Sequence, residues 1–376
     1  MPRGIVAFAE DWGGLPSSTQ HIVGRLARDR DVIWVNSIGL RRPRLDRRDL
    51  ARVAGKVRGL LSGRAPNAAP SADRPERLTV VSPMAVSWPG SGLARFVNRA
   101  ALGRQLRGRI AARGMARPIL WISLPTAVSV VGALGEGPIV YYCGDDFGAL
   151  AGVDHGPVSA MERELVERAD LILAASEALA AKFPASRTAL VPHGVDFALF
   201  STPAPRAADL PAAGPIAGFY GSIAEWIDVE LVARCATTMP DWTFVLIGQA
   251  QVDVSGLQAL PNVRLLGPRP HAALPSYAQH WDVSLLPFRD TPQIRACNPL
   301  KLREYLAAGP PIAAIDFPAL APYADAVRAT ADPARFVETI RLAAGDRADG
   351  GRRRGHVAEE SWDARASAVD ALLEAL

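Results

Sequence analysis

The chain repeats one pattern almost from end to end: a short run of β-forming residues, a loop, and then a stretch with helical spacing. Strands that alternate with helices in this way predict parallel sheets covered by helices on both faces. At 376 residues the chain is too long for one ordinary core, so we expect two such domains. The predicted strands are, in order, "GIVAFA", "DVIWVN", "LTVV", "PILWIS", "PIVYYC", "DLILAA" and "TALVP", then "IAGFYG", "WTFVLIG", "NVRLLG", "DVSLLPF" and "PIAAID".

A break in this pattern predicts the domain boundaries. After "PHGVDFALF" the Pro/Ala-rich segment "STPAPRAADLPAAGP" has no periodicity, and we interpret residues 197–214 as an interdomain linker. It separates a first Rossmann-like domain (1–196) from a second (215–355). The tail, 356–376, contains "SWDARASAVDALLEAL", which predicts a terminal helix that crosses back to the first domain. The predicted fold class is α/β, with two doubly wound domains facing one cleft.

Composition and spacing exclude several classes of protein. Hydrophobic residues make up 49% of the chain and charged residues 21%, as in globular proteins. "MPRGIVAFAEDW" is a first strand and not a signal peptide, and no apolar run is long enough to span a membrane. The cysteines Cys143, Cys235 and Cys297 have no metal or redox spacing, which favours reduced thiols in the cytoplasm. No G-x-G-x-x-G follows a strand, which argues against a dinucleotide dehydrogenase.

Positive charge is concentrated in one part of the chain. The net charge is +4, but Arg41 to Arg117 contains 18 Lys and Arg against 4 Asp and Glu, a net charge of +14. Within this segment Leu102, Leu106 and Ile110 recur every fourth residue among seven arginines, which predicts a basic amphipathic helix. The segment is either a solvated basic face or a surface that binds anionic lipid. Nucleic acid is disfavoured because aromatic residues for base stacking are not interleaved there.

Ligands of doubly wound sheets bind outside the carboxyl ends of the strands, so the loops after strands are the candidate sites. In "AGFYGSIAEWID" the residues Gly221 and Ser222 carry little side-chain bulk, so backbone N–H groups could approach a diphosphate closely. The alternative is a plain strand-to-helix turn. Gly248 ends the next strand in the same row. Phe288, after a further strand, either covers a base or ribose or packs in the core.

The stretch "NPLKLREYLAAGPP" predicts a short helix. Asn298 suits the N-cap, Pro299 the first helical position, and Gly309 the left-handed end. Lys301 and Glu304 lie one turn apart on one face, near the electropositive end of this helix. They are either a surface ion pair or a nucleotide site, in which the lysine binds phosphate and the carboxylate accepts ribose hydroxyls.

The strand–Gly-Ser loop, the "PHGVD" before the linker and "NPLKLREYLAAGPPIAA" resemble the motifs of GT-B glycosyltransferases. More narrowly, nearly the whole chain resembles bacterial exopolysaccharide glycosyltransferases, including the xanthan glucuronosyltransferase and teichuronic-acid-type enzymes. The resemblance implies the GT-B fold, a nucleotide-sugar donor in the second domain and an acceptor in the first, and we expect the donor to be UDP-linked. It also implies that neither a cofactor nor a metal is required.

The resemblance also implies roles for single residues. Lys301 would hold the donor phosphate, Glu304 would face the ribose or phosphates, and Ile223 would offer main-chain contacts. His193 and Gly194 would line the cleft at the domain junction. Many retaining GT-B enzymes have a second glutamate eight positions before the residue that matches Glu304, and this chain has Ala296 there. The full set of donor-binding candidates is Gly221, Ser222, Ile223, Gly248, Phe288, Asn298, Leu300, Lys301, Glu304, His193 and Gly194.

The first domain supplies the candidates for catalysis and acceptor binding. In "YYCGDDFGAL" the residues Asp145 and Asp146 follow a buried strand, where a carboxylate could take the proton of an acceptor hydroxyl. Asp145 matches the base of the xanthan enzyme; the alternative for both residues is a solvated turn that caps the next helix. In the first loop, Asp11, Trp12 and His21 could contact an acceptor sugar, with the indole stacked on its apolar face. For His21 a structural role is the alternative.

The sequence therefore predicts a hexosyltransferase-type enzyme that transfers a sugar from a nucleotide sugar to a lipid-linked saccharide or polysaccharide precursor in exopolysaccharide synthesis. We expect it to be cytoplasmic and peripheral at the inner face of the plasma membrane. Its expected partners are the donor, the acceptor and an anionic membrane surface contacted by residues 41–117, with no nucleic acid. The alternatives are a GT-B nucleotide-sugar epimerase and a non-catalytic sugar-binding relative.

Overall fold

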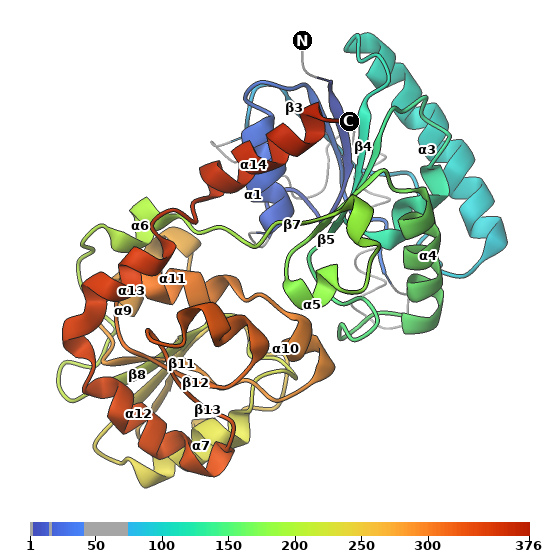
Figure 1. The fold of residues 1–376 in the computed structure, drawn as a ribbon. Coiled ribbons are helices and arrows are strands. Elements are labelled where there is room, and N and C mark those ends of the chain that lie inside the picture. The colour runs from blue at the N-terminus through green and yellow to red at the C-terminus, as the bar shows by residue number, and fades with distance from the viewer. Residues whose placement is uncertain (1–2, 15–16, 41–73) are drawn as a thin grey trace. The chain divides into compact units, whose positions relative to one another are not determined.

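The computed structural model describes residues 3–14, 17–40 and 74–376 of the chain. Contacts divide the chain into two compact units. Unit 1 comprises Met1–Pro192 together with Arg365–Leu376, and unit 2 comprises His193–Ala364. Each unit is built around one parallel sheet with helices packed on it (Figure 1). The basic run "RRPRLDRRDLARVAGKVRGLLSGR" lies outside the described residues.

The seven-stranded sheet of unit 1 has the order β3-β2-β1-β4-β5-β6-β7, and every neighbouring pair is parallel. All seven strands predicted for the first half of the chain are present. Strands β1, β2 and β4 are buried along their whole length, because helices cover both faces of the sheet. The strands are β1 Ile5–Phe8, β2 Val32–Val35, β3 Leu78–Val81, β4 Ile119–Ile122, β5 Ile139–Cys143, β6 Leu171–Ala174 and β7 Thr188–Leu190. The helices are α1 Ser18–Leu26, α3 Gly92–Ala112, α4 His155–Arg168 and α5 Glu177–Ala180.

Helix α3 is the predicted basic amphipathic helix, but its regular apolar stripe faces the protein. Leu102, Leu106 and Ile110 are all buried in the core of unit 1. The apolar stripe of this helix therefore belongs to the core of unit 1. Apolar residues that recur every fourth position indicate a helix face that is buried, but only the tertiary structure shows what that face packs against.

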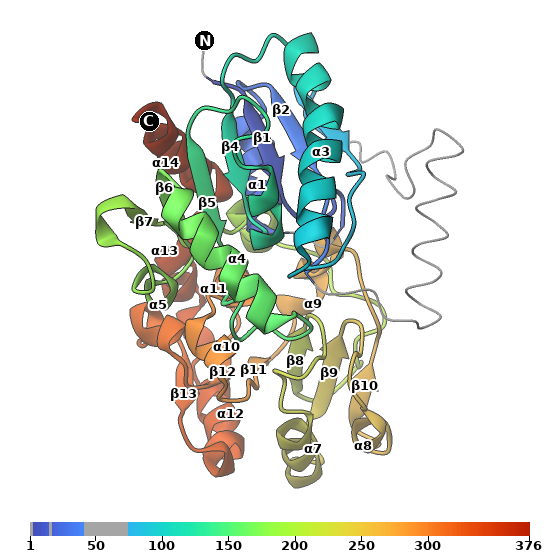
Figure 2. The same cartoon turned by 90° about the vertical axis from the view of Figure 1, so that its right-hand side faces the viewer.

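The six-stranded sheet of unit 2 has the order β10-β9-β8-β11-β12-β13, again with parallel neighbours (Figure 2). Five strands were predicted and the sixth, β13, was not. It is a short edge strand with mostly exposed side chains, so it has no hydrophobic pattern, and its pairing with β12 defines it. The strands are β8 Ile216–Tyr220, β9 Thr243–Ile247, β10 Val263–Leu265, β11 Val283–Leu286, β12 Ile312–Ile315 and β13 Arg328–Thr330.

The segment predicted as a linker is packed into unit 2. It includes the short helix α6 at its start, and both Phe200 and Leu210 are buried in the core of unit 2. Helix α11 packs on α6 and on α13. Residues 197–214 are therefore part of a folded unit and not a free connector. The helices of unit 2 are α6 Phe197–Ser201, α7 Val229–Thr238, α8 Ser255–Gln258, α9 Pro275–Ala278, α10 Pro292–Ala296, α11 Leu300–Ala308, α12 Phe336–Ala344 and α13 Gly350–Val357.

The C-terminal helix α14, Trp362–Glu374, returns to unit 1, as predicted (Figure 1). Arg30, which follows α1, is buried and donates from Nε to Asp370 at 2.8 Å. A second nitrogen of the same guanidinium donates to Glu374. A buried arginine that binds two carboxylates of one helix fixes the position of that helix on unit 1.

Candidate functional site

The loops after β8 and β9 meet without side chains between them. Gly221 and Gly248 have φ values of 131° and 144°, a region that side chains disfavour. A Cβ on Gly248 would lie 1.9 Å from the carbonyl oxygen of Gly221. A Cβ on Gly221 would lie 2.9 Å from Cε of Lys301 on α11. Three of the predicted donor-binding residues, on three different elements, therefore lie in direct contact at the carboxyl edge of this sheet.

Helix α11 has the predicted end but not the predicted start. Gly309 adopts the left-handed conformation at φ 96°, and its N–H donates to the carbonyl of Tyr305 at 3.0 Å. The N-cap is Pro299, not Asn298. Asn298 instead accepts a hydrogen bond from Arg303, a buried residue in the interior of the unit. The predicted capping role of Asn298 is therefore wrong, because a long-range partner competes for its side chain.

The ammonium group of Lys301 lies over two aromatic rings, 5.7 Å from the centroid of Phe219 and 5.6 Å from that of Phe288. Burial lowers the pKa of Lys301, although the negative charge of Glu304 opposes this shift. Among the described residues no carboxylate forms an ion pair with Lys301. The alternative of a simple Lys301–Glu304 surface ion pair is thus wrong, and the cation remains available for an anionic ligand.

Glu304 is held by two other side chains. The hydroxyl of Tyr220 donates to Oε2 and the Nε2 atom of His271 donates to Oε1, each at 2.7 Å. Burial lowers the pKa of His271, but the hydrogen bond and charge of Glu304, with the charge of Asp196, outweigh it and raise the pKa overall. The carboxylate is therefore fixed in orientation beside Lys301.

His271 was not among the predicted residues. It follows β10 in the sequence "GPRPHAAL", after the strand predicted as "NVRLLG". The rule that loops after strands line the site would have included it, but nothing local distinguishes this histidine from a surface residue. Its contact with Glu304, 33 residues later in the chain, identifies it.

Other predicted donor-binding residues have different surroundings. The N–H of Ile223 donates to the carbonyl of Gln249 at 3.0 Å, so this N–H is not free for a donor. Ser222, in contrast, has no hydrogen-bond partner for its N–H or hydroxyl within the described part of the chain. The ring of Phe288 is buried and packs edge-on against Phe317 at 5.4 Å. Of its two predicted roles, the structure shows core packing.

Leu300, His193 and Gly194 complete the predicted donor-binding set. Leu300 is the first residue of α11 and is partly exposed. His193 is partly buried at the start of unit 2. A Cβ on Gly194 would lie 2.8 Å from the indole of Trp362, so glycine is required for this packing. The ligand-binding roles of these three residues remain predictions.

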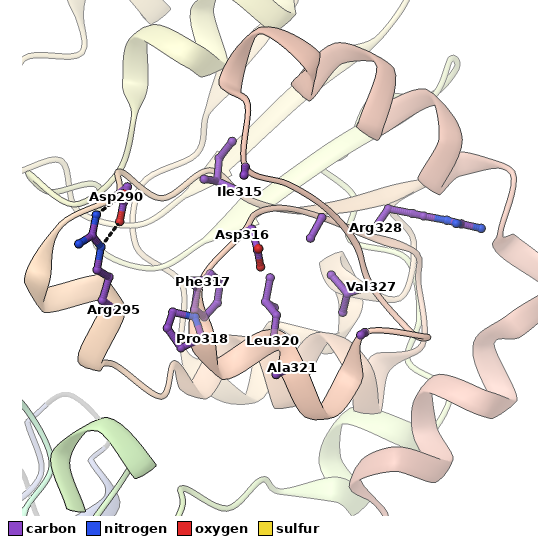
Figure 3. Close-up of a pocket in the computed structure, with 13 residues that line it drawn as sticks. Asp290, Arg295, Ile315, Asp316, Phe317, Pro318, Leu320, Ala321, Val327 and Arg328 are labelled. Atoms are coloured by element: carbon purple, nitrogen blue, oxygen red, sulfur yellow. Dashed lines mark hydrogen bonds and ion pairs between the residues drawn. The ribbon is translucent and has the colours of Figure 1, made fainter. Parts of the chain in front are cut away.

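Unit 2 also has a cavity of about 780 Å³ that includes none of the predicted residues (Figure 3). An ion pair between Asp290 and Arg295 lies at one side, and Asp316 lies among apolar side chains of the loop after β12 (Figure 3). Phe317 lines this cavity and packs on Phe288, the ring over which the ammonium group of Lys301 lies. The size of a cavity alone therefore does not identify the site in this unit.

In unit 1, Asp145 and Asp146 follow β5 but have different environments. Asp146 accepts from Nζ of Lys182 at 2.6 Å and from the N–H of Gly148 at 3.0 Å, which makes it part of a structured turn. The side chain of Asp145 is exposed and has no hydrogen-bond partner among the described residues. The surrounding protein, and then the like charge of Asp146, raise the pKa of Asp145. Of the two, only Asp145 is an unengaged proton acceptor.

A third carboxylate, Glu10, was not predicted. It follows β1 and accepts a hydrogen bond from the hydroxyl of Ser17, the N-cap of α1. Burial raises the pKa of Glu10 to about 7, and the nearby charges of Asp145 and Asp11 contribute to this shift. Glu10 and Asp145, 135 positions apart in the chain, therefore influence one another electrostatically at the carboxyl edge of the first sheet.

The predicted acceptor-binding residues lie in the loop after β1 and on α1. Asp11 accepts from the N–H of Ser37 at 3.1 Å. The indole of Trp12 packs edge-on against Trp34 at 4.9 Å and is partly exposed. His21 lies within 3.5 Å of Arg25 on the same helix. Asp11 and Trp12 adjoin Glu10, whereas His21 belongs to the side of α1.

In the described part of the chain, no three His, Cys, Asp or Glu side chains are arranged to bind a metal ion. No described helix is both long enough and apolar enough to cross a bilayer.

Two parallel doubly wound sheets with a returning C-terminal helix define the GT-B fold, and solved structures with this fold align over the whole chain. Anabaena HepE, solved in complex with UDP and glucose, has a TM-score of 0.68 at 13% identity and covers 100% of both chains. Sucrose-phosphate synthase of Thermosynechococcus elongatus has a TM-score of 0.70 at 17% identity and covers 99% of this chain and 98% of its own. At these identities the likeness shows the fold alone, and the predicted fold class is confirmed.

Among curated proteins, the chain is similar to TuaH of Bacillus subtilis, a glycosyltransferase provisionally assigned to teichuronic acid biosynthesis. The two are 29% identical over 223 residues, which is 54% of this chain and 56% of TuaH. The match therefore spans about half the length of this relative. No family model matches the chain. The predicted resemblance to GT-B and teichuronic-acid-type glycosyltransferases is confirmed by these similarities.

Proposed function

We propose that this chain is a glycosyltransferase that transfers a sugar from a UDP-sugar to a lipid-linked saccharide or polysaccharide precursor in cell-surface polysaccharide synthesis. The observation that carries the proposal is the contact of Gly221, Gly248 and the unpaired Lys301 at one sheet edge. The assignment of TuaH and the UDP and glucose bound to HepE support the same choice of donor and pathway class.

Each group in this cluster has a proposed role in binding the donor. Lys301 binds the diphosphate, and the amino end of α11 adds a favourable partial charge. The two glycines leave room for the phosphates to approach the backbone. Glu304 keeps lone pairs free after accepting from Tyr220 and His271, and these can accept ribose hydroxyls.

The chemical step needs a proton acceptor, and Asp145 is the group proposed for it. Its carboxylate takes the proton of the acceptor hydroxyl, and the resulting oxygen nucleophile bonds to the anomeric carbon of the donor sugar. The bond between that carbon and the diphosphate oxygen breaks, and UDP leaves with the electron pair. Lys301 stabilises the charge that develops on the leaving group. That no cofactor or metal is required stays a prediction, which activity in excess chelator would test.

The proposal extends to the location of the enzyme. A lipid-linked acceptor is presented by a membrane, and the net charge of +14 between Arg41 and Arg117 suits an anionic surface. We therefore propose a cytoplasmic protein that is peripheral at the inner face of the plasma membrane. The hexosyltransferase subtype belongs to this proposal as well.

A thermal-shift panel of nucleotide sugars, followed by a turnover assay, tests the proposed activity. A ligand at 100 times its dissociation constant stabilises the folded protein by about 2.7 kcal/mol, so the preferred donor should stand out. Release of UDP that depends on a glycan acceptor would then support a transferase. An epimerase would instead interconvert nucleotide sugars without an acceptor, and a non-catalytic relative would bind without turnover. Absence of any stabilisation by UDP-linked sugars would overturn the proposal.

A further inference from the structure

Large apolar side chains are exposed mainly in one part of unit 1. Among the described residues nine large hydrophobic side chains are exposed, and six of them lie between positions 84 and 97. Leu93 and Phe96 are 74% and 71% exposed, and Trp88 is 51% exposed. Monomeric proteins rarely expose such a group of neighbouring apolar residues without a function. We call this group the apolar patch: Met84, Val86, Trp88, Leu93, Phe96 and Val97.

The patch is built from two segments that lie side by side (Figure 2). The amide of Asn98 on α3 accepts from the N–H of Val86 at 2.7 Å and donates to its carbonyl at 2.9 Å. The amide of Gln105 binds Met84 and Ser82 in the same way. These bonds fix the segment before α3 along the helix, so its exposed side chains are anchored to a regular element.

Periodicity places the patch residues on common faces. Met84, Val86 and Trp88 are exposed and alternate with Ala85 and Ser87, which are less exposed. On α3, positions 93, 96 and 97 have helical spacing and share a face. The buried side of α3 is a different one, formed by residues that include Asn98, Leu102 and Leu106. The apolar patch is therefore separate from the core stripe, and its side chains are between 42% and 74% exposed.

The charge around the patch has one sign. From Leu78 to Arg117 the chain has seven arginines and no aspartate or glutamate. Arg95 is paired with Glu164 of α4 at 2.6 Å, and Arg113 with Asp31 at 3.3 Å. The remaining arginines of α3 have no carboxylate partner in the part of the chain that the structure describes. These are Arg99, Arg104, Arg107 and Arg109.

We propose that the apolar patch is a membrane-docking face, which inserts into the headgroup region of an anionic bilayer while arginines of α3 contact lipid phosphates. Exposed Trp, Phe and Leu beside uncompensated arginines are the chemistry of interfacial membrane helices. Trp88 suits the boundary between headgroups and acyl chains, where one side of the indole is apolar and the other is wet. The proposal rests on the proposed function only for its purpose, access to a lipid-linked acceptor.

Co-sedimentation of the full chain with vesicles tests the docking face. Vesicles of phosphatidylcholine are compared with vesicles that also contain phosphatidylglycerol. We expect binding to the anionic vesicles. The double variant Leu93→Asp/Phe96→Asp should bind with an affinity at least about tenfold lower, because burial of each apolar side chain in the bilayer contributes to the free energy of binding. The matched control is Leu342→Asp, since Leu342 on α12 is also exposed, at 57%, but lies in unit 2.

Two further measurements separate the contributions. Arg104→Gln/Arg109→Gln should reduce the part of the binding that salt weakens, while the apolar part persists. The indole emission of the wild type should shift to shorter wavelength on anionic vesicles, and this shift should shrink in Trp88→Phe. Equal vesicle binding by the Leu93→Asp/Phe96→Asp variant and the wild type overturns the proposal, as does an equal loss in Leu342→Asp.

Partner protein and lipid are distinguished in the same experiment. If the wild type forms a dimer that Leu93→Asp/Phe96→Asp abolishes, the patch binds a second copy of the chain and the membrane proposal is wrong. UDP-sugar binding is measured in every variant by thermal shift, which also reports folding. A variant that loses vesicle binding but still binds nucleotide is folded, and its defect lies in the docking face and not in the donor site. Absence of nucleotide binding with intact vesicle binding overturns the proposed function and leaves the docking face standing.

Discussion

The two units have the same kind of parallel sheet but opposite chemistry at the carboxyl edge. In unit 2 the loops after β8 and β9 begin with Gly221 and Gly248, which lie against each other, and Gly221 lies against the side chain of Lys301. In unit 1 the loops after β1 and β5 carry the carboxylates of Glu10 and Asp145. A parallel sheet delivers loop residues to one edge whatever their chemistry. The loops, and not the sheet, therefore decide what each edge binds.

The two edges also differ in how firmly their groups are held. Glu304 in unit 2 is fixed by Tyr220 and His271, which suits a residue that orients a ligand. Asp145 in unit 1 has no such partner among the described residues, and desolvation by the surrounding protein, followed by the charge of Asp146, raises its pKa. A carboxylate whose pKa is raised accepts a proton more readily at neutral pH. The residues proposed for ligand binding and for proton transfer thus lie in different local environments on the same type of sheet.

The largest effect is expected from Asp145→Asn, which removes the proton acceptor and keeps the size of the side chain. General-base catalysis contributes about 10²–10⁴-fold, so turnover should fall by a factor in that range. The affinity for UDP should be unchanged, because the proposed donor site lies in unit 2. Steady-state rates and a UDP titration measure the two quantities.

Asp146→Asn is the matched control for this experiment. Asp146 is already bound by Lys182 and by the N–H of Gly148, so its loss should affect the turn more than the reaction. A greater fall in turnover for Asp146→Asn than for Asp145→Asn would show that the two roles have been assigned the wrong way round.

Gly248→Ala should destabilise unit 2. The residue has φ 144°, and the added Cβ would overlap the carbonyl oxygen of Gly221. Backbone strain of this kind costs about 1–3 kcal/mol, and the overlap adds to it. Calorimetric unfolding should show a lower transition temperature. Gly256→Ala is the control, because its Cβ would meet nothing within 4 Å; if the two variants melt alike, the close contact of the two loops is not real.

Lys301→Ala should weaken UDP binding by roughly ten- to a hundredfold, since hydrogen bonds to charged groups are worth about 1.5–3 kcal/mol. Isothermal titration with UDP measures the change. Arg295→Ala removes an exposed cation of the same unit that is already paired with Asp290, and it should have little effect. Equal UDP affinity in the wild type and Lys301→Ala would disprove the donor assignment.

The smallest effect concerns pH and Glu10. Its pKa is raised from 4.5 to about 7 in the folded protein, so folding favours the protonated carboxyl. The stability that this group contributes is therefore fully present below about pH 4.5 and is lost as the pH rises through about 7. Glu10→Gln resembles the protonated form at every pH. The transition temperature of the variant should therefore rise relative to that of the wild type as the pH increases across this window.

Glu167→Gln, an exposed position on α4, is the control for this comparison. Melting curves at several pH values for the three proteins measure the difference. A constant difference between Glu10→Gln and the wild type over the whole window would mean that Glu10 does not titrate there.

Local patterns were sufficient for most of the fold. Each predicted strand is a short apolar run bounded by turn residues, and these runs coincide with strands in the structure. Strand β13 was missed because its side chains are exposed and its only strand-like property is the pairing with β12. The segment 197–214 was interpreted as a linker because its composition is that of a loop, yet Phe200 anchors it in a core.

The site was predictable where a residue is required by the backbone itself. Gly221 and Gly248 were found from their positions after strands, and their positive φ values explain the requirement for glycine. His271 was missed because its partner, Glu304, is remote in the chain, and Glu10 was missed because its raised pKa comes mainly from burial in the folded unit. Spacing carries no information about such partners.

The sequence by itself determined the succession of strands and helices, including the last helix, and the residue types that follow the strands, because these depend on short-range periodicity and on steric limits of the backbone. Only the tertiary structure decided which side of α3 is buried, which partner Asn298 binds, and which carboxylates lie close enough to interact electrostatically. Burial and electrostatic energies depend on distances between residues that are far apart in the chain, and folding sets those distances.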